Sequence, residues 1–370
     1  MRRKTNSSSS AQSLPPELWL YVHRLATSYR SPLDLAYSSR DRYGASEDPF
    51  NGTRSFFQDV CSFVRVCKLW NELAQELLYE NVKVNNRFAM LSAVLERPET
   101  ARLVRSIRLS PTRFDHNFAI LKRCPLVEAL VLPEFPRPDK VAFTTDSQLS
   151  PLLSLKCIYW KESSWSSALL QSVFKVAQNL EHLRLSSSST IGSDRDIPLV
   201  QPAFGLQSLV IAQLSPPWVQ SVLRTDLHHL TRLIANPEHL SADTLPELPY
   251  LHTLEVSGRS RLISIPFPDI FLRCPNLRDL CYDVGHSIVL PEKTVRSTVS
   301  CVRLHISDAN VPEWTLFDVH FNFLLSPAFV ELNRLVLHGT FQSYFVGKHD
   351  LHDQFYARGC RIEFDDGTTM

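Results

Sequence analysis

Histidines and cysteines are the residues of this chain best suited to chemistry, and their spacing predicts no catalytic or metal-binding site. The histidine pairs are His228-His229 and His349-Asp350-Leu351-His352, and neither has cysteine or carboxylate partners at the spacing of metal ligands. The eight cysteines lie at positions 61, 67, 124, 157, 274, 281, 301 and 360 and form no C-x-x-C pair. This scatter predicts reduced thiols that pack as small apolar residues, in the cytoplasm, the nucleus or both.

Motifs for nucleotide and acyl chemistry are also absent from the sequence. Neither G-x-x-x-x-G-K nor G-x-G-x-x-G occurs, and ten glycines leave little room for a loop that cradles phosphate. The nucleophile motif G-x-S-x-G is missing too. We therefore predict no catalytic residue, no cofactor and no metal, and we do not expect the chain to be an enzyme.

Composition narrows the possible partners. The formal net charge is +1, so no overall field attracts the chain to nucleic acid or to an anionic membrane. No apolar run approaches the roughly 18 residues of a membrane span, and no signal-peptide pattern follows Met1. We expect neither nucleic acid nor membrane as a partner.

A repeated pattern predicts the elements that would position a binding surface. With φ for any apolar residue, the pattern φ-x-x-φ-x-φ occurs eleven times, and neighbouring starts are 21 to 33 residues apart. The starts are Val104, Val127, Leu155, Leu180, Leu206, Leu230, Leu251, Leu277, Val299, Leu332 and Ala357. A period of about 20 to 29 residues is typical of leucine-rich repeats. The predicted fold for residues 85–370 is therefore an α/β solenoid, with a curved parallel sheet and helices on its convex side.

The segments between these patterns predict helices and an irregular array. Helical periodicity occurs in Ser164–Gln178, Trp218–Arg224, Asp269–Arg273 and Glu313–Leu325. The longest spacing, from Val299 to Leu332, predicts an extra turn. Regular leucine-rich repeats carry Asn or Cys eight residues after the first φ, and no such ladder exists in the units compared, so we expect uneven curvature.

The N-terminal residues carry a resemblance to a known family. Residues 1–13 are predicted to be disordered, and 14–84 to form a helical module with an inserted loop at about 28–54. The segments L-P-P-E-L-W at Leu14–Trp19, V-R-V-C-K-L-W-N-E-L-A at Val64–Ala74 and L-L-Y-E-N-V at Leu77–Val82 resemble an F-box. They are most similar to the F-box-like proteins abundant in mushroom-forming fungi.

This resemblance implies a function and a set of contact residues. In that family, the segment is a three-helix unit that docks onto a Skp-type adaptor of a cullin–RING ubiquitin ligase. The residues that would contact the adaptor are Leu14, Pro15, Leu18, Trp19, Val22, Val64, Cys67 and Trp70. An alternative interpretation makes the same apolar residues the core of a helical cap that shields the first repeat.

The outward strand positions predict where a target protein would bind. The candidates are Tyr159, Arg184, Arg303, His305, Arg334 and His338, and the last four would form a mildly basic patch for an acidic peptide. A solvated sheet face with no dedicated ligand is the alternative. The sequence thus predicts a substrate-recognition subunit of a Skp–cullin–F-box ligase, or a repeat scaffold with no role in ubiquitination.

Overall fold

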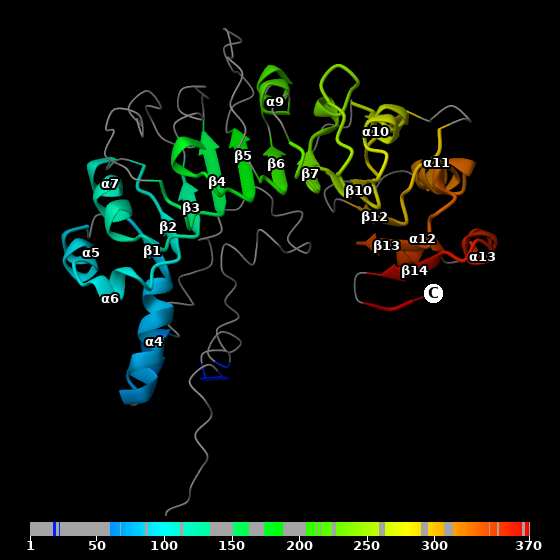
Figure 1. Cartoon of the computed structure of the whole chain (residues 1–370). Coiled ribbons are helices and arrows are strands. Elements are labelled where there is room, and N and C mark those ends of the chain that lie inside the picture. Colours follow the sequence, from blue (N-terminus) through cyan, green and yellow to red (C-terminus); the bar gives the residue numbers. More distant parts are fainter. Residues whose placement is uncertain are drawn as a thin grey trace, which may run out of the picture.

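A computed structural model describes residues 18–19, 22, 60–66, 68–85, 88–111, 114–133, 151–162, 174–187, 205–212, 214, 216–223, 227–258, 263–289, 295–306, 314–339, 341–345, 348–364 and 367–369. These residues form an arch built on a twelve-stranded sheet whose neighbouring strands are all parallel (Figure 1). The strands follow one another in chain order. Their bounds are β1 Asn81–Lys83, β2 Ser106–Arg108, β3 Ala129–Leu132, β4 Cys157–Glu162, β5 His182–Ser187, β6 Ser208–Ala212, β7 Arg232–Ala235, β8 Thr253–Val256, β10 Asp279–Asp283, β12 Cys301–His305, β13 Arg334–His338 and β14 Arg361–Phe364. A separate parallel pair joins β9 (Ile265–Pro266) to β11 (Ile288–Val289).

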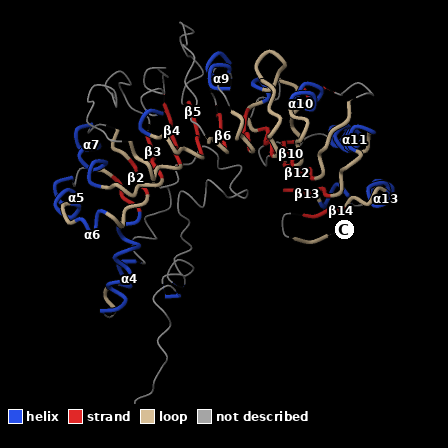
Figure 2. Tube along the Cα trace, in the orientation of Figure 1, coloured by secondary structure: helices blue, strands red, loops and turns tan. Residues whose placement is uncertain are grey.

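Helices cover the outer side of the arch (Figure 2). They are α5 Phe88–Leu95, α6 Pro98–Ala101, α7 Phe114–Arg123, α9 Pro216–Leu223, α10 Phe267–Arg273, α11 Trp314–Leu324, α12 Gln342–Phe345 and α13 His349–Ala357, with 3-10 turns at Pro237–His239 and Pro327–Phe329. Helix α4 (Lys68–Glu80) lies outside this layer and extends from the β1 end of the sheet (Figure 1). This arrangement confirms the predicted α/β class, with a long parallel sheet and helices on its convex side. The predicted helices at 218–224, 269–273 and 313–325 correspond to α9, α10 and α11, whereas most of 164–178 lies outside the described residues. The 3-10 turn at Pro327–Phe329 is the extra turn expected between Val299 and Leu332.

The inward residues of neighbouring strands stack in register. From Val104 to Leu332, each first φ lies two residues before its strand, as Leu155 does before β4, and the other two φ residues point into the core. Ile158 pairs with Leu183, which pairs in turn with Leu209, and all three are at most 1% exposed. Because each apolar layer covers the next, strands too short to be stable alone share one continuous core.

Hydrogen bonds extend this register beyond the strand ends. The carbonyl of Lys156 accepts from the backbone N–H groups of both Glu181 and His182, at 2.9 Å each. Side chains just before the first φ add bonds between units: Asn179 Nδ2 donates to the Leu153 carbonyl, and Asn276 Nδ2 to the Pro249 carbonyl, both at 2.8 Å. Asparagine therefore does link some units. It does so from the position directly before the first φ, not from the position eight residues after it.

The structure changes the predicted array at both of its ends. Ile362 pairs with Leu335 and Phe364 with Leu337, so the last unit begins at Gly359. The predicted start at Ala357 is wrong, because that residue is still in α13. At the other end, β1 pairs with β2 and adds a unit that begins at Tyr79, so the sheet starts four residues before the expected boundary at residue 85.

Candidate functional site

Two rows of side chains line the inner face of the arch, at the first and third positions of the paired strands, and we call them the first row and the third row. The second position, between them, points into the core. The first row is Asn81, Ser106, Ala129, Cys157, His182, Ser208, Arg232, Thr253, Asp279, Cys301, Arg334 and Arg361. The third row lies two residues further along each strand and is Lys83, Arg108, Val131, Tyr159, Arg184, Val210, Ile234, Glu255, Cys281, Arg303, Val336 and Glu363. Since side chains alternate along a strand, both rows face away from the main core.

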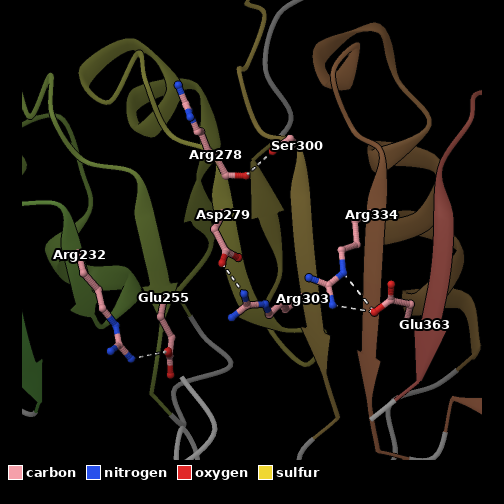
Figure 3. Close-up of polar contacts among 8 residues, drawn as sticks. All are labelled: Arg232, Glu255, Arg278, Asp279, Ser300, Arg303, Arg334 and Glu363. Carbon is pink, nitrogen blue, oxygen red and sulfur yellow. Dashed lines mark hydrogen bonds and ion pairs between the residues drawn. The ribbon is translucent and has the colours of Figure 1, made fainter. Parts of the chain in front are cut away.

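Ion pairs cross this face on one repeated diagonal (Figure 3). Each joins a first-row residue to a third-row residue of the next strand. Arg232 Nη2 lies 4.0 Å from Glu255 Oε2, Arg303 Nη2 lies 2.6 Å from Asp279 Oδ2, and Arg334 Nη2 lies 2.7 Å from Glu363 Oε2. Figure 3 also shows Arg278, just before β10, whose carbonyl accepts from the N–H of Ser300 at 2.9 Å. The diagonal thus places an arginine beside a carboxylate on three pairs of strands among the described residues.

The predicted C-terminal patch is assembled, but with less positive charge than the sequence suggested. Arg303, His305, Arg334 and His338 lie on the adjoining strands β12 and β13, and the two histidine rings stack at 4.2 Å with an interplanar angle of 4°. Both arginines are held by carboxylates of the chain itself. Hydrogen bonding to Arg334 also lowers the pKa of Glu363, so this carboxylate stays ionised. The patch is therefore mixed in charge.

Tyr159 and Arg184 form a second group, near the middle of the sheet. The Arg184 guanidinium carbon is 5.9 Å from the centroid of the Tyr159 ring, a cation–π contact. Tyr159 belongs to a small apolar cluster of the inner face, together with Ala129, Val131 and Cys157. Burial raises the pKa of Cys157 to about 12, so its thiol is neutral beside the arginine. Burial likewise lowers the pKa of Arg184.

The residues predicted to contact an adaptor fall into three sets. Trp19 packs on Trp70, with ring centroids 5.5 Å apart, and Phe63 meets Trp70 edge-on at 5.6 Å. Val64 is partly buried against the cluster of Val60, Ala74 and Leu77. Leu18 and Val22, in contrast, are 47% and 41% exposed. Leu14, Pro15 and Cys67 lie outside the described residues.

The partners of the arginines were missed in the sequence. The predicted target-binding residues do not include Asp279, Glu255 and Glu363, which pair with arginines, or Cys157, which lies on the diagonal of Arg184. The signal that could have found them is the diagonal itself. It joins the residue two positions after the first φ of one unit to the residue four positions after the first φ of the next unit.

Two further findings concern sites that the described residues do not form. Within the described part of the chain, no three His, Cys, Asp or Glu side chains gather closely enough to hold a metal ion. Among the same residues, no helix has the length and apolar character needed to cross a membrane.

Comparison with known proteins assigns no family to the chain. No protein-family model matches it, and a search of curated proteins found no match.

Proposed function

We propose that this chain is the target-recognition subunit of a Skp–cullin–F-box type ubiquitin ligase. In this proposal, the N-terminal F-box-like helices bind a Skp-type adaptor and, through it, the cullin scaffold. The sheet, as an irregular leucine-rich-repeat solenoid, holds a target protein on its inner face. The chain performs no chemistry. It raises the effective concentration of the target near the ubiquitin-loaded enzyme.

The observation that carries the proposal is the pair Leu18 and Val22. Both residues are helical and lie one turn apart, so their side chains share one face of the helix. They are 47% and 41% exposed, whereas Trp19 between them is turned onto Trp70. An exposed apolar pair beside a packed aromatic residue is a suitable surface for a partner helix.

The alternative is a repeat scaffold whose helical end serves as a cap, with no role in ubiquitination. One observation favours it: α4 ends at Glu80 and β1 begins at the next residue, Asn81. Leu77 of this helix is 0% exposed, and the helix leads straight into the first strand. A helix so joined can shield the end of a repeat array.

The decisive experiment co-purifies the full chain with a fungal Skp-type adaptor. Changing Leu18→Ser and Val22→Ser together is expected to weaken the complex roughly 100-fold, because two apolar anchors are lost from the centre of the interface. Size-exclusion chromatography and titration calorimetry would measure this loss. Circular dichroism should be unchanged, since both side chains are exposed.

A matched control removes an exposed apolar side chain elsewhere. Met90→Ser changes a residue that is 61% exposed on α5 and should leave the adaptor complex intact. Trp19→Ala is a poorer test because it also removes packing from Trp70. If the Leu18/Val22 variant co-elutes with the adaptor as the wild type does, or the wild type forms no complex, the scaffold alternative replaces the ligase proposal.

A further inference from the structure

Arg184 occupies a diagonal of the inner face that holds an arginine but no carboxylate. On the diagonals that begin at Arg232, Asp279 and Arg334, an arginine meets an acidic side chain within 4.0 Å. The diagonal that begins at Cys157 leads to Arg184 by the same register step. There the partner is a neutral thiol, so the arginine has a neighbour but no counter-ion on its diagonal.

The surroundings of Arg184 do not supply the missing charge. Its Nη2 atom is buried and has no hydrogen-bond partner, and no described carboxylate lies within ion-pair distance of it. Glu255 attracts the guanidinium from further away, but this carboxylate is paired with Arg232. His182 on the same strand does not compete for an anion, because burial lowers its pKa to about 4 and leaves the ring neutral. A half-buried guanidinium without a counter-ion lowers the stability of the folded chain. An anion that binds to it would offset this loss.

We propose that Arg184 is the anion-recognition residue of the target-binding face, and that it takes a carboxylate or a phosphate from a segment of the bound protein. The anion would lie beside Arg184 as Asp279 lies beside Arg303, the ion pair in which the arginine is also in the third row. The apolar floor of Ala129, Val131, Cys157 and Tyr159 lowers the local polarity and so strengthens a charged hydrogen bond to the guanidinium. The inference deepens the proposed function, and rests on it for the nature of the ligand.

The test uses the purified full chain without any adaptor, and inorganic phosphate as the probe. Thermal unfolding is followed as phosphate or acetate replaces chloride at constant ionic strength. Binding to the native state raises the unfolding midpoint by mass action. Arg184→Gln is expected to need at least about tenfold more phosphate for the same rise. Arg303→Gln, which changes an arginine already paired with Asp279, should respond as the wild type does. Equal responses of wild type and Arg184→Gln would overturn the inference.

A second variant restores the carboxylate that the diagonal lacks. Cys157→Asp is expected to pair with Arg184 and to abolish the phosphate response while the far-ultraviolet circular dichroism is kept. Cys157→Ser is the matched control and should keep the response. Should Cys157→Asp fail to fold, Arg184→Lys takes its place: it keeps the charge but not the fork of donors, so it should retain only part of the response. A full response in Arg184→Lys or in a folded Cys157→Asp would count against the inference.

A peptide array separates the two sources of the anion. Short peptides that differ only in a central glutamate, phosphoserine or glutamine are tested against the full chain. Preference for glutamate identifies a carboxylate, and preference for phosphoserine identifies a phosphate. Equal binding of the glutamine peptides contradicts the inference. Because no adaptor is present, a failed anion response leaves the adaptor complex standing, and a failed adaptor complex leaves the anion response standing.

Discussion

Replacing Phe321 with alanine is expected to lower the free energy of unfolding by about 3 to 5 kcal/mol. Phe321 lies in α11 and is 0% exposed. Its ring packs against Tyr344 and Phe345, each at a centroid distance of 5.3 Å, and against Phe355 at 6.0 Å. These partners come from α12 and α13, so truncation leaves a cavity where three helices meet. Urea unfolding followed by circular dichroism measures the change.

The control for this variant lies on the same helix. Val319→Ala changes a side chain that is 45% exposed, and its effect should stay within about 0.5 kcal/mol. Phe321→Ala should also loosen the C-terminal end first, because units of a repeat array are stabilised by their immediate neighbours. Hydrogen exchange would show this if Phe321→Ala accelerates it more in β13 and β14 than in β4 and β5, relative to the wild type. Equal losses for the two variants would mean that the aromatic cluster does not hold the end of the sheet.

The centre of the repeat array was predictable because its inward positions tolerate few residue types. From Val104 to Leu332, each first φ lies against a unit on both sides, so an apolar residue is required there. At the C-terminal end, the first position of the last unit does not require an apolar residue. Gly359 has a φ of +74°, a left-handed turn after α13 that favours glycine over an apolar side chain. The nearby Ala357, Cys360 and Ile362 imitate the pattern two residues too early.

The inner face was harder to predict because its pairs depend on register between strands. The outward residues follow from alternation within a single strand, which the sequence shows. Arg334 and Glu363, however, are 29 residues apart and lie in different rows. Placing the last unit at Ala357 moved Glu363 out of the third row. An error of two residues thus concealed the counter-ion, and the C-terminal patch seemed more basic than it is.

The N-terminal helix shows a second limit of sequence patterns. Leu18, Trp19 and Val22 are all apolar, and both a packed core and a docking surface use such residues. Only the contact between Trp19 and Trp70 separates the packed side chain from the exposed ones. The sequence therefore predicted an apolar segment without distinguishing the roles of its residues, and this distinction makes Leu18 and Val22 better positions than Trp19 for the adaptor test.

Buried histidines give the stability of the chain a defined dependence on pH. Burial lowers the pKa of His182 and of His320 to about 4, from an ordinary value of 6.5, and burial also lowers the pKa of His239. The unfolded chain therefore binds more protons than the folded chain between these values. Stability is fully present above pH 6.5 and is lost as the pH falls toward 4. Asp318 and Glu363 have lowered pKa values too, from 3.8 and 4.5, so their contributions are lost only in more acidic solution.

Acidification from pH 8 to pH 5 is accordingly expected to cost about 2 kcal/mol for each of His182 and His320. Urea unfolding at intervals between these pH values measures the loss. His320→Gln removes one titrating group, and its stability should fall with a slope that is smaller by about one proton. If His320→Gln loses stability as steeply as the wild type, His320 takes up its proton in the folded chain as readily as in the unfolded chain, and its burial does not keep the ring neutral.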